Sequence, residues 1–246
     1  MYPFLYLASQ SPRRQELLTQ LGVRFELLLS DSNENAEAIE TPLPNENARA
    51  YVERVTLAKC AAAEQRWAKR NLTWAPILCA DTTVSLPNSD AAQILGKPED
   101  AADAKRILRL LSGQTHEVLT AIALLPERSA KPISLVQVSQ VEFMPLSDTL
   151  IKAYIASQEP YGKAGAYGIQ GLGSAFIRRI NGSYSGIMGL PLFEMATLLQ
   201  QAGVSFTLTP EIPNQVHYER RDSDQHYTPR NTGGIDSTSS STRAAN

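Results

Sequence analysis

The sequence predicts an α/β fold built on a mixed sheet with flanking helices, and three observations support this. Residues 4–86 alternate between strand-like and helix-like patterns, which favours parallel strands joined by helices. Strand-like segments follow between residues 117 and 144, and the break at Pro126–Pro132 is typical of an antiparallel hairpin. An amphipathic helix is expected at Pro191–Gln201. The 246 residues are enough for one large domain of this class or two small ones.

The chain begins with a strand, a turn of small residues and a helix. Phe4–Ala8 is a short apolar run, as expected of a strand that is covered on both faces. Ser9 and Ser11 are typical turn and N-cap residues, and Pro12 suits a first helical turn because its missing N–H is not needed there. The helix is therefore expected to begin near Pro12, and Gly22 is a suitable residue to end it.

Two more strands and a long helix are expected in the rest of the first half. They are a strand at 25–29, a polar loop at 30–47, an alanine-rich helix at 47–69 and a buried strand at 76–80. Asp81, Thr82 and Thr83 follow the end of that last strand, and residues 84–86 can continue it. Pro87–Gln93 is a small polar insertion without obvious chemistry.

The second half is expected to contain strands and helices in alternation. In chain order they are a helix entry at 98–100, a helix at 101–111, strands at 117–125, 133–138 and 140–144, a helix at 150–157, a strand at 175–180, a loop of small residues at 185–189, the helix at 191–201 and an edge strand at 206–208. Between residues 161 and 173 the chain is unusually rich in glycine, which indicates positive φ angles or a close approach to a ligand.

Composition and missing motifs exclude several classes of protein. The net charge of −2 argues against a nucleic-acid partner, and no apolar run is long enough to span a membrane or form a signal peptide. Cys60 and Cys79 do not make a disulfide framework and are expected to be buried free thiols, so a cytoplasmic protein is predicted. The three histidines lack metal-ligand spacing, and the chain has no dinucleotide fingerprint, P-loop or nucleophile elbow.

The C-terminal residues differ in composition from the rest of the chain. From about Pro210 apolar residues become sparse, and polar residues dominate to Asn246. We therefore predict a folded domain over residues 1–209 and a disordered tail over residues 210–246.

Charged residues point to a phosphate site at the ends of the first strands. Arg13 and Arg14 fall in the first turn of a helix, where free backbone N–H groups already favour an anion. The carboxyl ends of parallel strands share one edge, so Asp81 is expected nearby. A carboxylate beside several cations could activate a water for attack on a polyphosphate. A purely structural explanation stays open for each of these residues. The two arginines and the lysines 59, 97 and 163 would then be solvated surface residues, and Asp81 would cap a turn.

Seven ordered motifs resemble those of the Maf family of nucleoside triphosphate pyrophosphatases. They are LASQSPRRQELL at residues 7–18, Leu57-Ala58-Lys59 (one residue shorter than the family pattern), Ala80-Asp81-Thr82, Lys97-Pro98, Ser112–His116, Lys163–Gly171 and Gly182–Pro191. The resemblance covers about residues 4–200 and implies a cleft between two lobes, as in the inosine-triphosphate pyrophosphatases. It also implies cleavage between the α and β phosphates with a divalent metal, Mg²⁺ or Mn²⁺, and suggests a homodimer.

The resemblance also implies roles for individual residues. Asp81 matches the family's general base, and a polar set matches its phosphate-binding residues: Ser9, Arg14, Lys59, Lys97 and Lys163. Glu34 matches an acidic loop position, so Glu34 and Asp81 are the candidate metal ligands. Arg13, Thr82 and Gln170 match the subgroup that resembles dTTP/UTP pyrophosphatases. An amide such as that of Gln170 offers both a donor and an acceptor to a uracil or thymine edge.

The expected function is therefore hydrolysis of dTTP and UTP, with modified pyrimidine triphosphates included in the hypothesis, to the monophosphate and pyrophosphate. This would remove unwanted nucleotides from the pool. Two alternatives remain: a pyrophosphatase of other or modified nucleotides, and a nucleotide-binding regulator of cell division or septum formation.

Overall fold

A computed structural model describes residues 1–31, 34, 39–86 and 93–209. Residues Met1–Thr209 form one compact unit. Within the described residues, the strands are β1 (Leu5–Leu7), β2 (Phe25–Leu27), β3 (Ile77–Leu86), β4 (Gln93–Leu95), β5 (Thr115–Leu125), β6 (Ile133–Phe143) and β7 (Ile177–Asn181). The α-helices are α1 (Pro12–Gln20), α3 (Ala48–Lys69), α4 (Ala101–Leu111), α5 (Asp148–Ala156), α6 (Tyr184–Met188) and α7 (Leu192–Gln201), and two short 3₁₀ helices are η1 (Ala164–Ala166) and η2 (Leu172–Phe176).

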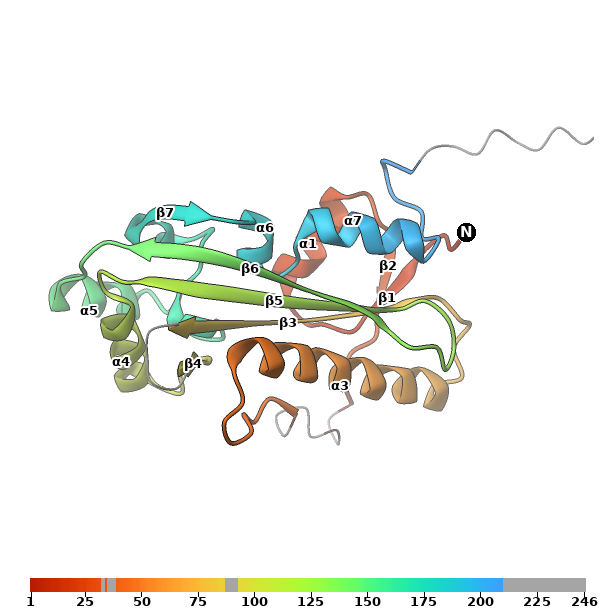
Figure 1. The fold of residues 1–246 in the computed structure, drawn as a ribbon, viewed down its shortest axis with the longest axis horizontal. Helices are drawn as coiled ribbons and strands as arrows, with labels where there is room; N and C mark the ends of the chain where they lie inside the picture. Colours follow the sequence, from red (N-terminus) through yellow and green to blue (C-terminus); the bar gives the residue numbers. More distant parts are fainter. Residues whose placement is uncertain (32–33, 35–38, 87–92, 210–246) are drawn as a thin grey trace, which may run out of the picture. The chain divides into compact units, whose positions relative to one another are not determined.

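All seven of these strands belong to one mixed sheet, which confirms the predicted fold class. The order along the sheet is β2-β1-β3-β5-β6-β7, and β4 pairs with β3. β1 is parallel to β2 and β3, as the alternation in the first half predicted. The pairs β3–β4, β3–β5, β5–β6 and β6–β7 are antiparallel. Figure 1 shows α3 along one face of the sheet and α1 and α7 on the other.

β3 is the strand on which the pocket described below depends, because its neighbours on one edge do not cover its full length. β1 pairs with β3 only at its start, through Tyr6 with Ile77 and Leu7 with Leu78. β4 pairs with the far end of β3, from Val84 onward. Between these two stretches lie residues 79–83, which pair with neither β1 nor β4. A gap in the sheet therefore opens beside the middle of β3.

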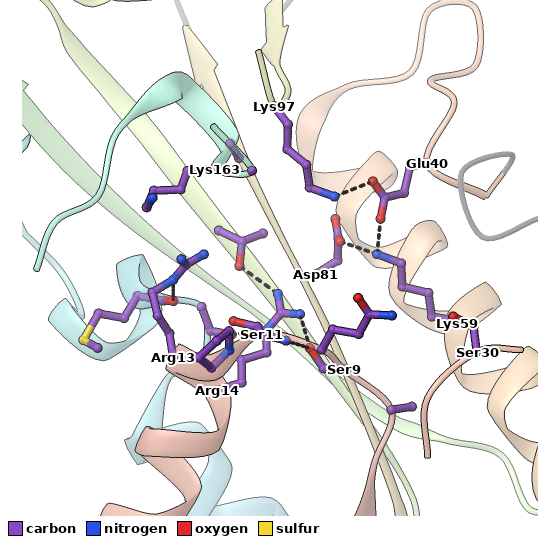
Figure 2. A pocket seen from close by; sticks show the side chains of 18 of the residues that line it. Ser9, Ser11, Arg13, Arg14, Ser30, Glu40, Lys59, Asp81, Lys97 and Lys163 are labelled. Carbon is purple, nitrogen blue, oxygen red and sulfur yellow. Dashed lines mark hydrogen bonds and ion pairs between the residues drawn. The ribbon is translucent and has the colours of Figure 1, made fainter. Parts of the chain in front are cut away.

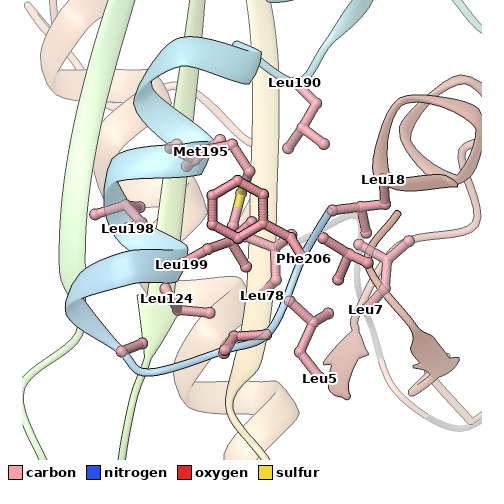
Figure 3. Packing of buried hydrophobic residues seen from close by; sticks show 14 of the residues in the cluster. Leu5, Leu7, Leu18, Leu78, Leu124, Leu190, Met195, Leu198, Leu199 and Phe206 are labelled. Carbon is pink, nitrogen blue, oxygen red and sulfur yellow. The ribbon is translucent and has the colours of Figure 1, made fainter. Parts of the chain in front are cut away.

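Alternate residues of β3 face opposite layers of the core. Leu78 and Ala80 pack with Leu5, Leu7 and residues of α1 and α7 (Figure 3). Ile77 and Cys79 pack instead with Cys60, Ala63 and Trp67 of α3. The period of two in a strand continues this alternation, so Asp81 faces α3 and Thr82 faces α1.

The helix boundaries follow from local signals that the sequence displays. Ser11 precedes Pro12 at the start of α1, and Gly22 just after that helix has a φ of 70°. Asn47 caps α3 by accepting from the N–H of Ala50, and Asp100 caps α4 in the same way through Asp103. Each of these caps is worth about 1 kcal/mol. Cys60 and Cys79 are buried free thiols, as predicted.

Four sequence-based boundaries were wrong. Residues 84–86 continue the strand expected at 76–80, as allowed for, but Asp81–Thr83 belong to the same strand instead of following its end, because β5 pairs with it up to Ser85. The strands expected at 133–138 and 140–144 are one strand, β6, since β5 pairs with it on both sides of Ser139.

The other two errors lie near the end of the domain. The loop expected at 185–189 is mostly the short helix α6, which Ser183 caps by accepting from the N–H of Gly186. Residues 206–208 do not form an edge strand; instead Val204 makes a single bridge to Tyr2. The predictions for residues 87–92 of the polar insertion and for the tail at 210–246 lie outside the described residues.

Candidate active site

A pocket of about 850 Å³ opens at the gap beside β3. Its walls come from the start of α1, from α3, from β3 and from the glycine-rich segment. All ten residues that the sequence singled out line it: Ser9, Arg13, Arg14, Glu34, Lys59, Asp81, Thr82, Lys97, Lys163 and Gln170. The topology therefore brings into one pocket side chains that are up to 161 positions apart in the chain.

Arg14 is fixed by hydrogen bonds on one side of the pocket. Its Nε donates to the carbonyl of Gly189 at 2.9 Å, and its two Nη atoms donate to Ser9 Oγ at 3.1 Å and to Thr82 Oγ1 at 3.3 Å. Burial lowers the pKa of Arg14, and the charge of Asp81 partly offsets that effect. An arginine with a reference pKa above 12 keeps its charge under such a shift, so α1 presents a permanent cation at its N-terminus. Arg14 is therefore not a solvated surface arginine, because its guanidinium donates to three acceptors of the protein.

Asp81 lies in a chain of alternating charges on the opposite side of the strand. Lys59 Nζ donates to Asp81 Oδ1 and to Glu40 Oε1, each at 2.7 Å, and Lys97 Nζ donates to Glu40 Oε2 at 2.9 Å (Figure 2). Asp81 is 9% exposed and lies within β3, so the alternative in which it caps a turn is wrong. The shortened spacing at Leu57–Lys59 does not remove Lys59 from the pocket.

Glu40 is the residue of this site that sequence reasoning missed. Burial raises the pKa of Glu40, but the charges and hydrogen bonds of Lys59 and Lys97 outweigh burial and hold that pKa below its usual value. The backbone around it is tied to α3: the Tyr51 hydroxyl donates to the carbonyl of Glu40, and Arg54 donates to the carbonyls of residues 39 and 41. The sequence showed only an acidic residue in a polar loop, because the two lysines that meet it are remote in the chain.

Glu34 lines the same pocket, but its carboxylate is paired with Arg66 of α3. Its carboxylate accepts from Arg66 Nε at 2.8 Å and from Arg66 Nη2 at 2.5 Å. The hydrogen bond with Arg66 lowers the pKa of Glu34 to about 2. Among the described residues, no group of three or more histidine, cysteine or acidic side chains could hold a metal ion by itself. A metal there would therefore depend on one or two carboxylates together with oxygens of a bound ligand.

The glycine-rich segment forms the wall that faces the arginines. Gly165 has a φ of 71°, and a Cβ on it would lie 2.7 Å from Val84 Cγ2, so the backbone approaches β3 closely. Tyr167 anchors the segment to the sheet through its hydroxyl, which lies 2.9 Å from Nε2 of the buried His116. Burial lowers the pKa of His116 to about 3, so this imidazole is neutral at physiological pH.

Arg13 and Lys163 approach the pocket from opposite walls. Arg13 Nε donates to the carbonyl of Met188 at 3.3 Å, and burial lowers the pKa of Arg13. Lys163 donates to the carbonyl of Glu159; burial and then the charge of Arg13 lower its pKa. A polyanionic ligand between these walls would offset the effect of the Arg13 charge on Lys163.

At the gap in the sheet, Arg13, Arg14 and the lysines 59, 97 and 163 line one pocket with the buried carboxylate of Asp81, an arrangement that suits a polyanionic ligand. The matching family model agrees: it is described as Maf-like protein and covers residues 4–202. The chain belongs to the Maf family.

Relatives share more than half of their residues with this chain. One from Ralstonia nicotianae, named dTTP/UTP pyrophosphatase, is 57% identical over 83% of this chain and 96% of its own length. One of the same name from Albidiferax ferrireducens is 56% identical over 82% of this chain and 98% of its own. A third from Cupriavidus metallidurans, also of that name, is 55% identical over 84% of this chain and all of its own. In the part of the chain that the structure describes, no helix is both long and apolar enough to cross a membrane.

Proposed function

We propose that this protein hydrolyses dTTP and UTP to the nucleoside monophosphate and pyrophosphate, and so removes these or modified pyrimidine triphosphates from the nucleotide pool. The observation that carries the proposal is the pocket itself, where Arg13, Arg14 and three lysines surround the buried Asp81. The three phosphate groups of a triphosphate carry the opposite charge and can contact several of these cations at once. The names of the relatives support the choice of substrate.

The phosphate-binding residues would act from both sides of β3. Arg14 and Ser9 present donors at the N-terminus of α1, and Lys59, Lys97 and Lys163 supply further cations around them. Stabilising the negative charge that develops on the phosphates is the largest contribution such residues can make. In this arrangement the triphosphate takes over the lysine contacts that Glu40 makes in its absence.

Asp81 is the proposed general base. Its carboxylate would accept a proton from the water that attacks the α phosphorus, and the P–O bond to the β phosphate would break, with pyrophosphate leaving. Lys59 holds one oxygen of this carboxylate, Oδ1, at 2.7 Å, and thereby orients the side chain. General base catalysis by a carboxylate needs this kind of fixed geometry.

Arg13, Thr82 and Gln170 are the proposed determinants of base choice. Gln170 is an exposed residue on the pocket wall, where its amide can offer a donor and an acceptor to uracil or thymine. The Thr82 hydroxyl lies 2.9 Å from that of Thr120 and accepts from Arg14. Thr82 therefore influences the ligand through the orientation of Arg14.

A divalent cation, Mg²⁺ or Mn²⁺, fits this site best at Asp81 and Glu40. Both carboxylates contact the same Lys59 Nζ at 2.7 Å, so a cation held by these two hard oxygen ligands would take the place of that ammonium once a bound triphosphate draws Lys59 away. A bound cation would neutralise phosphate charge. Glu34 is a weaker choice than sequence resemblance suggests, because Arg66 occupies both of its oxygens.

Three further features are part of the proposal. They are a homodimer, a cytoplasmic location, and a division into a catalytic domain at 1–209 and a polar tail at 210–246. The two buried free thiols support the cytoplasmic location, and the end of the family match at residue 202 supports the division into a domain and a tail.

A panel of common ribonucleoside and deoxyribonucleoside triphosphates, with Mg²⁺ or Mn²⁺, tests the function when products are separated by chromatography. We expect monophosphate and pyrophosphate from dTTP and UTP. Release of diphosphate and phosphate would move the attack to the γ phosphorus and refute the mechanism. A preference for a purine triphosphate would refute the substrate assignment, and binding without turnover would favour a regulatory protein.

A further inference from the structure

Both Lys163 and Gln170 belong to the segment at 162–171, which has no strand pairing of its own. Its only regular structure is the single turn η1. Tyr167 and Ile169 bury their side chains, whereas Gln170 faces the pocket. The position of Gln170 therefore depends on whatever holds the backbone on either side of it.

Glu159 accepts hydrogen bonds next to this segment, in addition to those that the segment itself makes with Gly96, His116 and Tyr154. Its Oε2 accepts from the N–H of Leu172 at 2.8 Å, and its Oε1 accepts from the N–H of Gly173 at 3.0 Å. Oε1 also accepts from the Tyr154 hydroxyl at 2.8 Å, and the backbone carbonyl of Glu159 accepts from Lys163 Nζ. One residue thus contacts the chain on both sides of Gln170, at Lys163 within the segment and at Leu172 and Gly173 just after it.

The glycines nearby are shaped to this carboxylate. A Cβ on Gly171 would lie 2.4 Å from Glu159 Oε2, and one on Gly168 would lie 3.1 Å from Lys163 Cε. The N–H of Gly168 donates to the Tyr154 hydroxyl at 3.3 Å, so Tyr154 links the carboxylate to the other end of the segment.

Glu159 is held in its ionised form. Partial burial raises the pKa of Glu159, but the N–H groups of Gly173 and Leu172 and the Tyr154 hydroxyl outweigh burial and keep that pKa below its usual value. An ionised carboxylate accepts hydrogen bonds on both oxygens, which an amide cannot do.

We propose that Glu159 is a positioning residue that fixes the 162–171 segment, and that through it the Gln170 amide discriminates uracil from cytosine. This inference rests on the proposed function for its substrate. Uracil and cytosine exchange donor and acceptor at neighbouring positions, so an amide discriminates between them only while its own orientation is fixed.

Glu159→Gln tests this in the full-length protein. The substitution keeps the shape of the side chain but turns one NH₂ group toward a backbone N–H. We expect the ratio of kcat/KM for UTP to that for CTP to fall about tenfold, the effect of one lost hydrogen bond. We expect most of the change to appear in KM for UTP. Glu142→Gln is the matched control, because Glu142 pairs with Arg178 outside the pocket.

A second readout does not depend on activity. Hydrogen exchange of residues 168–173 should be faster in Glu159→Gln than in the wild type, and unchanged in Glu142→Gln. If Glu159→Gln fails to fold, Tyr154→Phe removes only the hydroxyl that donates to Glu159 and should shift both readouts in the same direction.

Each combination of results decides the proposal. Faster exchange with a lower UTP/CTP ratio supports it. Faster exchange with an unchanged ratio refutes the link to base choice, and unchanged exchange refutes the positioning role. A wild type that does not hydrolyse UTP refutes the proposed function, and with it the link to base choice. The hydrogen-exchange measurement still tests the positioning role in that case.

Discussion

Lys59 on α3 and Asp81 on β3 form an ion pair inside the pocket, with 2.7 Å between Nζ and Oδ1. The pair joins a helix on one face of the sheet to the middle of β3, and Glu40 extends it to Lys97. A triphosphate that binds the lysines must break or share these contacts. Without a ligand, these carboxylates and lysines therefore neutralise one another's charge, and the following predictions test the roles proposed for them.

Asp81→Asn should lower kcat for UTP by about 10²–10⁴-fold, because the amide cannot accept a proton from water. The substitution is nearly isosteric, so the thermal unfolding midpoint should change little. Asp148→Asn is the control, since Asp148 is an exposed acid paired with Arg109 outside the pocket. Unchanged turnover in Asp81→Asn would remove Asp81 from the role of general base.

Glu40→Gln should weaken binding of Mn²⁺ measured by calorimetry in the presence of a non-hydrolysable UTP analogue, by about tenfold or more. Glu34→Gln is the matched comparison and should change binding much less, because Arg66 already holds Glu34. The reverse result would return the metal ligand to Glu34 and would mean that the Glu34–Arg66 pair opens when nucleotide binds.

Arg14→Lys should lower the free energy of unfolding in urea by about 1–3 kcal/mol, because an ammonium cannot satisfy three acceptors that a guanidinium reaches together. These acceptors are the Gly189 carbonyl and the hydroxyls of Ser9 and Thr82. Arg109→Lys changes an exposed pair and should alter stability by less than about 0.5 kcal/mol. Equal effects of the two substitutions would show that Arg14 has no structural role.

His116 should make the fold less stable in mild acid. Its pKa of about 3 in the folded protein is depressed by burial, so between that value and about 6.5 the unfolded chain binds a proton that the folded protein does not. Stability from this group is complete above about pH 6.5 and is lost as the pH falls. From about pH 7.5 to about pH 5 the free energy of unfolding should fall by about 2 kcal/mol more in the wild type than in His116→Gln. Parallel pH profiles for the two proteins would contradict this.

Local signals in the sequence predicted most of the helices. The starts of α1, α3, α4 and α5 each carry a capping residue or proline, and these signals act over a few positions. The length of β3 and the continuity of β6 were not predictable in this way. Both strands are extended by pairing with β5, a contact between separate strands that the local pattern of either segment does not reveal.

The site was predicted more completely than the strands around it. All ten singled-out residues line one pocket, although their roles remain predictions. Glu40 and Glu159 were missed because each acquires its importance from partners in other elements: Lys59 and Lys97 for Glu40, and the N–H groups of η2 for Glu159. A polar residue in a loop gives no local signal of such contacts.

The bonds from Arg13 and Arg14 to the carbonyls of Met188 and Gly189 join residues 175 positions apart. During synthesis at about 5–20 residues per second, the first helix must therefore wait on the order of ten seconds or more for these partners to leave the ribosome. α7, which shares its core with Leu5, Leu7 and Leu18, emerges later still. We expect the nascent chain to gain the ability to bind nucleotide only when translation of the whole domain is almost complete.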